Sequence, residues 1–112
     1  MTTATLHHVR TDQLVYTWTP ETWPAGVLTG YVGADGGFVL EHVIAFDRTP
    51  TSALALVRAG LEAAWEWGFG HVVFQIPHAH PQGAGLQALA RRVGARAYQT
   101  TATTAFFVRY RP

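Results

Sequence analysis

Few side chains in this sequence could carry acid–base chemistry, and two of them are neighbours. Glu41 and His42 are the polar residues of an otherwise apolar run, Phe38–Phe46. A strand this apolar predicts cover on both faces, and burial raises the pKa of a carboxyl group, which makes Glu41 a candidate general base. The simpler interpretation places Glu41 at the wet end of the strand, paired with an arginine or a backbone amide. Because adjacent strand residues point to opposite faces, we expect that Glu41 and His42 do not line one cleft, and that His42 is a hydrogen-bonded core histidine.

Two further histidines, His78 and His80, follow a second apolar run, His71–Ile76. Ligand sites of α/β proteins gather at the carboxyl ends of sheet strands, so both histidines are candidates for a base at an acceptor site. Loop polarity without a function is the plainer interpretation. A His-x-His pair with no carboxylate or cysteine nearby is poor evidence for a metal, and we predict no metal site.

Composition argues against several classes of function. The chain has a net charge of +1, no cysteine and no run of 18 apolar residues. A charge this small gives no case for nucleic-acid binding, and we expect no membrane span. No Ser-His-Asp order, cysteine nucleophile or Walker loop supports hydrolysis or phosphoryl transfer. The first eight residues lack the pattern of a signal peptide, so we expect a cytoplasmic protein.

Length and composition also bear on organisation. The 112 residues fit a single domain, 1–112. Residues 1–26 are poorly defined: 4–9 reads as a strand, and 12–18 as a short helix or a strand. The recognisable core is 27–110. With 13% charged and 12% aromatic residues, the composition favours some surface hidden in a homodimer or against another protein.

From Val27 onward the hydrophobic pattern is regular enough to place the elements that hold these side chains. Asp35-Gly36 lies between two apolar runs and predicts a hairpin with a type I′ turn. Thr49 and Pro50 suit the N-cap and the first position of a helix. The expected elements are strands at 27–33 and 38–46, a helix at 50–67, a parallel strand at 71–76, a helix at 86–93, and strands near 96–100 and 105–110.

This order of hairpin, helix, strand, helix and hairpin predicts an α/β (α+β) fold with a mixed sheet. It resembles the core of the GNAT superfamily of N-acetyltransferases. In that family, the strand after the first hairpin runs into a loop of pattern Gln/Arg-x-x-Gly-x-Gly/Ala, whose amides bind the pyrophosphate of acetyl-CoA. The matching stretch here is 48–53. Arg48 and Ala53 fit the pattern, Thr51 takes the place of the first glycine, and Pro50 removes one amide donor.

A second family motif, Leu-Tyr-x-x-x-Gly-Phe, ends the last helix. Here Leu89 and Gly94 match, but Ala90 takes the place of the tyrosine that often serves as general acid. Tyr98, shortly after this helix, is the candidate replacement. The trimmed N-terminal part is similar to that of small members associated with bacteriophage genomes.

The resemblance also implies where the acyl donor lies. The pantetheine arm of acetyl-CoA would run between the two parallel strands, 38–46 and 71–76, where they splay. A β-bulge near Val43–Phe46 would supply an amide to the developing oxyanion. The implied cofactor-binding residues are Val43, Ala45, Arg48, Thr51, Ser52 and Ala53, and the candidate catalytic residues are Glu41, His78 and Tyr98.

The function implied by the resemblance is N-acyl transfer, in which an acetyl group moves directly from acetyl-CoA to an amine. The alternative is a catalytically inactive GNAT-like domain that serves in binding or assembly, as a structural or host-interaction protein. The two hypotheses differ in whether Thr51, Ser52 and Ala53 still offer free amides to a phosphate.

Overall fold

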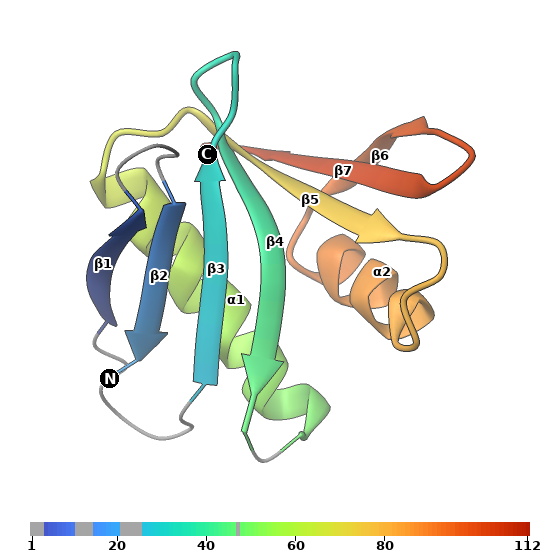
Figure 1. Cartoon of the computed structure of the whole chain (residues 1–112), viewed down its shortest axis with the longest axis horizontal. Helices are drawn as coiled ribbons and strands as arrows, with labels where there is room; N and C mark the ends of the chain where they lie inside the picture. The colour runs from blue at the N-terminus through green and yellow to red at the C-terminus, as the bar shows by residue number, and fades with distance from the viewer. Residues whose placement is uncertain (1–3, 11–14, 21–25, 47) are drawn as a thin grey trace.

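The computed structural model describes residues 4–10, 15–20, 26–46 and 48–112, which form one continuous sheet with two helices (Figure 1). The elements are β1 (Ala4–Arg10), β2 (Val15–Pro20), β3 (Gly26–Val32), β4 (Phe38–Ala45), α1 (Pro50–Glu66), β5 (His71–Pro77), α2 (Gly83–Arg92), β6 (Arg96–Thr100) and β7 (Thr104–Tyr110). The strand order across the sheet is β1-β2-β3-β4-β5-β7-β6. β4 and β5 run parallel, and the other neighbouring pairs among the described strands are antiparallel.

This architecture confirms the predicted fold class. The hairpin β3–β4 is followed by the helix α1, which makes the crossover that lets β5 run parallel to β4. The helix α2 and the antiparallel pair β6–β7 complete the predicted order. The poorly defined N-terminal part contributes β1 and β2, which extend the sheet beyond the hairpin. Residues 15–20 are therefore a strand, while Asp12 lies outside the described residues.

The β3–β4 turn is closed by a carboxylate that accepts a bond from its own loop. The Gly37 amide donates to Oδ1 of Asp35 at 3.0 Å, and Nε2 of His71 lies 3.0 Å from Oδ2 of the same residue. These two contacts, the amide first, hold the pKa of the Asp35 carboxyl below its usual range. Gly36 has a φ of 87°, but Asp35 is not left-handed. The prediction of a type I′ turn was therefore wrong, because that turn needs two such residues.

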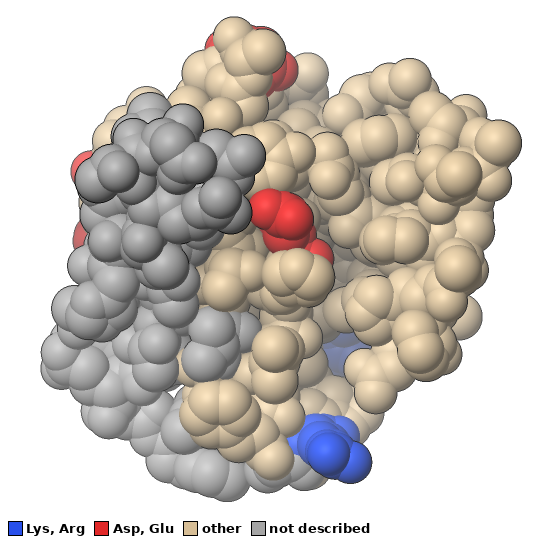
Figure 2. Space-filling view, in the orientation of Figure 1, with Lys and Arg blue, Asp and Glu red and all other residues tan. Residues whose placement is uncertain are grey.

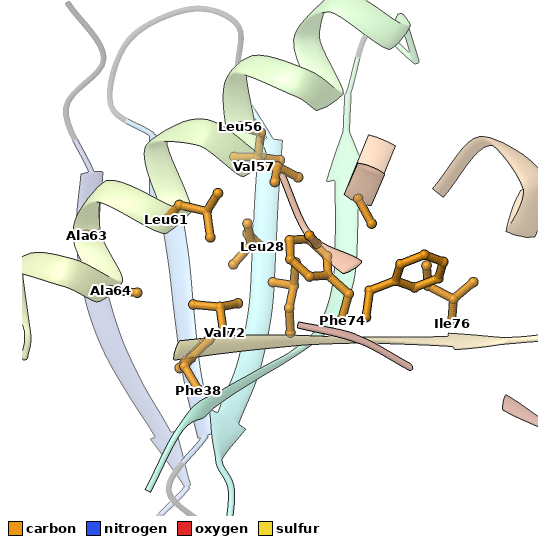
Figure 3. Packing of buried hydrophobic residues seen from close by; sticks show 14 of the residues in the cluster. Leu28, Phe38, Leu56, Val57, Leu61, Ala63, Ala64, Val72, Phe74 and Ile76 are labelled. Atoms are coloured by element: carbon orange, nitrogen blue, oxygen red, sulfur yellow. The ribbon is translucent and has the colours of Figure 1, made fainter. Parts of the chain in front are cut away.

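The core lies between the two helices and one face of the sheet (Figure 3). Leu56 and Val57 of α1 are almost fully buried, and Phe107 of β7 is 1% exposed. Ala90 of α2 joins the same cluster, so both helices cover the same face. In Figure 1, α1 crosses behind the first four strands, and α2 lies beside β5. This arrangement brings the start of α1 and the body of α2 to opposite sides of one gap in the sheet.

Gly30 of β3 occupies a position where no side chain fits. A Cβ there would meet the carbonyl oxygen of Val39 and lie 2.6 Å from the ring of Phe38. We expect Gly30→Ala to lower the free energy of unfolding by about 1–3 kcal/mol, because overpacking displaces the neighbouring strand. Urea denaturation measures this change.

Gly85→Ala is the matched control. No heavy atom lies within 4 Å of a Cβ added at Gly85, which is in α2. Alanine inside a helix is favoured over glycine by about 0.5–1 kcal/mol, so this variant should gain stability. A Gly30→Ala protein as stable as the wild type would contradict the close approach of β3 and β4.

Candidate functional site

The site begins where β4 and β5 part. The two strands pair only over Phe38–Leu40 and Val72–Phe74, and beyond these residues they diverge, as Figure 1 shows. The predicted splay is therefore present. Past Leu40, the edge of β4 that faces β5 has no strand partner within the described ranges. An edge without a neighbouring strand is the kind of surface with which an extended ligand can pair.

A β-bulge lies at the point of divergence. Leu40 is opposite Gly30 and His42 is opposite Thr29, so Glu41 is an extra residue in β4. The predicted position of the bulge, near Val43–Phe46, was wrong, because the register over 43–45 is regular.

The bulge also corrects the expectation that neighbouring residues must face apart. Glu41 and His42 line the same cavity, because an extra residue interrupts the alternation of the strand. Both side chains are exposed, so the burial expected of Glu41 was wrong. The expected cover on both faces of β4 therefore holds only for Phe38–Leu40, and the expectation of a core histidine at position 42 was wrong.

The cavity at the divergence, here called the slot, has a volume of about 190 Å³. Its polar side chains are Glu41, His42, Gln75 and His80. Its apolar walls come from both strands and both helices and consist of Leu40, Val43, Ile44, Val57, Phe74, Ile76, Leu86 and Leu89. A narrow, mostly apolar space with a few polar groups at its rim is the usual form of a ligand site.

A larger cavity of about 1090 Å³, here called the groove, lies between the start of α1 and α2. Five of the predicted cofactor-binding residues line it: Val43, Ala45, Arg48, Thr51 and Ala53. The slot and the groove adjoin each other, and together they are here called the channel. They share lining residues from β4, from α2 and from the loop before α2, namely Val43, Ile44, His80, Leu86 and Leu89.

Most backbone amides in the first turn of α1 are hydrogen-bonded to the N-cap residue. As predicted, Thr49 is the N-cap and Pro50 occupies the first helical position. The Ser52 amide donates to Oγ1 of Thr49 at 3.2 Å, and the Ala53 amide donates to the Thr49 carbonyl oxygen at 3.1 Å. Ser52 is 5% exposed and does not line the groove. Among the described residues, only the Thr51 amide of this turn has no partner, so the first turn offers a phosphate one donor rather than three.

Positive charge lines the groove at two places. Arg48 and Arg92 both face it, and no carboxylate is among its lining residues within the part of the chain that the structure describes. Figure 2 shows a basic side chain at the lower edge of the face in view, further basic surface set back in the hollow above it, and an acidic side chain near the centre. Arg91, the neighbour of Arg92, instead stacks 5.1 Å over the ring of Phe107. The groove is therefore suited to an anionic ligand.

Arg48 adopts a backbone conformation that is unusual for its type. Its φ is 59°, in the left-handed region, and its amide donates to the Ala45 carbonyl oxygen at 2.9 Å. The left-handed conformation costs a residue with a Cβ about 1–2 kcal/mol. Such conformations concentrate at functional sites, and this one lies in the turn that leads from β4 into α1.

The two loop histidines, His78 and His80, have different surroundings. Nε2 of His78 lies 3.0 Å from the Thr101 carbonyl oxygen, and its amide donates to the Thr103 carbonyl oxygen. His78 thus ties its loop to the β6–β7 turn and lines neither cavity. His80 lines both the slot and the groove. The sequence marked both histidines as candidates, but only the fold distinguishes them.

Tyr98 also lies away from the channel. It sits on β6 with half of its surface exposed, and its ring centroid is 6.1 Å from that of Phe106. Partial burial, followed by the charge of Asp35, raises the pKa of its hydroxyl. Tyr98 lines neither the slot nor the groove, so the structure does not bring it together with Glu41.

Gln75 is a polar lining residue that the sequence analysis did not single out. Its Nε2 donates to the Tyr31 hydroxyl at 3.0 Å, which joins β5 to β3 across β4. Its place in an apolar strand was the available signal. This bond braces the sheet at the closed end of the slot.

Two kinds of feature are absent from the described residues. No group of three or more His, Cys, Asp or Glu side chains in these ranges could hold a metal ion. No helix in the same ranges is long and apolar enough to cross a membrane.

Comparison with known proteins rests on structure alone. No protein-family model matches the sequence, and no curated protein matches it significantly. A protein from Klebsiella pneumoniae subsp. pneumoniae MGH 78578, assigned as an acyl-CoA N-acyltransferase, has a TM-score of 0.72 at 14% identity, over 98% of this chain and 97% of that one. PaiA N-acetyltransferase from Thermoplasma acidophilum, solved with coenzyme A, has a TM-score of 0.69 at 9% identity. A GNAT-family acetyltransferase structure from Chromobacterium violaceum ATCC 12472 has a TM-score of 0.65 at 23% identity.

The chain therefore has the GNAT fold. It covers 61% of the Thermoplasma protein and 60% of the Chromobacterium protein, with 87% and 90% of its own length aligned. The Klebsiella protein, matched along nearly its full length, shows the same compact form of the fold. A bacteriophage origin has no support among these matches.

The capping contact at the start of α1 leads to a prediction about stability. Thr49→Ala removes the side chain that accepts from the Ser52 amide, and losing such a cap costs about 0.5–2 kcal/mol. Thr51→Ala is the control, since Thr51 is exposed on the same turn and its hydroxyl caps no described residue. Urea midpoints that fall equally for both variants would show that the capping bond does not form.

Proposed function

We propose that this protein is an N-acyltransferase that moves an acetyl group from acetyl-CoA to an amine by direct transfer. The observation that carries the proposal is the channel, in which the basic groove adjoins the slot between β4 and β5 and the bulge with Glu41 lines the slot. Each part of an acyl-CoA has a matching part of this channel.

The phosphate end would lie in the groove. Arg48 and Arg92 supply charge there, and the Thr51 amide supplies one backbone donor. Because the other amides of the first turn are bonded to Thr49, the guanidinium groups would carry most of the attraction to phosphate. Such charge-assisted bonds are stronger than neutral ones.

The pantetheine arm would lie along the unpaired edge of β4 beyond Leu40. Backbone groups on this edge can bond an extended amide-bearing chain as they would bond a strand. The apolar walls of the slot, from Val43 to Leu89, exclude water from the acyl group.

Glu41 would act as the base at the end of the slot. It takes a proton from the ammonium form of the acceptor, so that the amine lone pair can attack. When bound, acetyl-CoA supplies a thioester carbon that accepts the amine and a sulfur that leaves. The new C–N bond forms, the C–S bond breaks with its electron pair on sulfur, and the second proton leaves the nitrogen. The thiolate takes up one proton, so each turnover releases one proton overall.

Two observations favour the alternative, a GNAT-like domain without activity. The first turn of α1 offers a single free amide among the described residues, and the helix α2 carries Ala90 where the family often has a tyrosine. If the protein binds no CoA in the titration described below, the second function is the one supported.

The cofactor site predicts micromolar binding of acetyl-CoA, measured by isothermal titration. Arg48→Gly removes the guanidinium while glycine keeps the left-handed backbone, and we expect roughly 10–100-fold weaker binding from the loss of a charge-assisted contact. Arg58→Ala is the control, since Arg58 is exposed on α1 and lines neither cavity. No heat up to millimolar acetyl-CoA, or equal losses for both variants, would contradict the site.

If Glu41 is the base, replacing it should lower turnover without weakening the binding of acetyl-CoA. Glu41→Gln keeps the shape of the side chain but cannot accept the proton, so kcat with an amine panel should fall roughly 10²–10⁴-fold. The affinity for acetyl-CoA should change little. Glu62→Gln, on the exposed face of α1, should behave as the wild type. An unchanged kcat for Glu41→Gln would remove Glu41 from the mechanism.

A further inference from the structure

His80 lines the channel where the slot and the groove adjoin. Of the five residues shared by the slot and the groove, it is the polar one, and the other four are Val43, Ile44, Leu86 and Leu89. The shared stretch is where a ligand that fills both cavities must pass from one to the other. A hydrogen-bonding group there would meet the middle of such a ligand.

Local hydrogen bonds fix the imidazole ring of His80. The Gln82 amide donates to Nδ1 at 3.0 Å. The backbone of His80 is also held. Its amide donates to the Pro77 carbonyl oxygen and its carbonyl oxygen accepts from the Gly83 amide, both at 3.0 Å. The loop therefore presents this ring to the channel in a defined orientation.

The contact with Gln82 decides where the ring proton lies. A backbone amide can only donate, so Nδ1 must be the acceptor, and the neutral ring carries its proton on Nε2. Nε2–H is then the one polar group of the ring left for a ligand, and it is a donor. Glu41 and His42 in the slot, with Arg48 and Arg92 in the groove, are the titratable or charged groups that line the channel beside it.

We propose that His80 is a catalytic residue that stays neutral and donates a hydrogen bond from Nε2 to the sulfur of the thioester. This inference rests on the proposed acyl transfer. As the C–S bond breaks and its electron pair moves to sulfur, the bond from Nε2–H strengthens and stabilises the thiolate. His80 gives up no proton, and the thiolate takes its proton from solvent after it leaves. A neutral imidazole can act as such a donor without becoming an acid in the Brønsted sense.

The position of His80 favours sulfur over the acyl oxygen as its partner. The acyl group would lie deeper in the slot, beside the bulge at Glu41, whereas His80 lies where slot and groove meet. Tyr98 lies elsewhere, and α2 carries Ala90 instead of a hydroxyl. Within the described residues, His80 is therefore the side chain suited to serve the leaving group.

The first test is a spectrum of the imidazole nitrogens in ¹⁵N-labelled protein, with and without free CoA. We expect His80 to be neutral with its proton on Nε2, and its Nε2 signal to shift when CoA binds. His78, in the same loop but outside the channel, should not shift. A proton on Nδ1, or a His80 signal that saturating CoA leaves unmoved, would overturn the inference while leaving CoA binding established. If the wild type binds no CoA, the proposed function fails and this inference fails with it.

Kinetics give the second test. His80→Ala should lower kcat roughly 10²–10³-fold, the order found when a single donor to a developing charge is removed, while the KM for acetyl-CoA changes little. His80→Gln places an amide N–H near the position of Nε2 and should recover most of the loss. His78→Ala should match the wild type. A His80→Ala enzyme with wild-type kcat, or a glutamine variant as slow as the alanine variant, would refute the role of the Nε2–H donor.

Discussion

The parting of β4 from β5 after three paired residues is the constraint on which the rest of the site depends. Two parallel strands in a sheet normally satisfy each other's backbone groups along their length. Here the pairing stops at Leu40 and Phe74, and the bulge at Glu41 turns β4 away at that point. The unpaired edge, the slot and the shared orientation of Glu41 and His42 all follow from this one break. The bond between Gln75 and Tyr31 limits it by holding the sheet together at the closed end.

The phosphate end shows a balance between helix stability and ligand binding. A helix N-terminus attracts anions because its first amides have no internal partner. In α1 the N-cap Thr49 takes up two of these amides, and Pro50 lacks a third. The helix gains a satisfied first turn, and the groove keeps its positive character through Arg48 and Arg92. Attraction through flexible guanidinium groups falls more with added salt than attraction through fixed amides, since exposed charges are screened.

The sequence predicted the order of elements well, because hydrophobic runs, Asp-Gly and Thr-Pro are local signals. The splay of β4 and β5 came from the resemblance, and it too was confirmed. The bulge was misplaced, because nothing local distinguishes an extra residue from a paired one in an apolar strand. That error led directly to the wrong separation of Glu41 from His42. Sequence reasoning named His78 as the catalytic candidate, and it could not foresee how the two histidines differ in the fold. His78 contacts Thr101 in the β6–β7 turn, whereas His80 accepts from the Gln82 amide beside the channel. The binding and catalytic roles of all these residues remain predictions.

The bulge has a consequence for how this strand can change over evolutionary time. Phe38 and Leu40 face the core before the bulge, and Val43 faces it after, so the inward parity switches at Glu41. Many replacements of Glu41 would leave this arrangement in place, since its side chain is exposed. Removing the residue altogether would restore a regular register, because Leu40 and His42 would then be consecutive residues opposite Gly30 and Thr29, with Val43 still inward. The extra residue therefore alters the course of the strand and not the face of its later side chains, so a related chain that lacked it would keep this core while losing the irregularity at the slot.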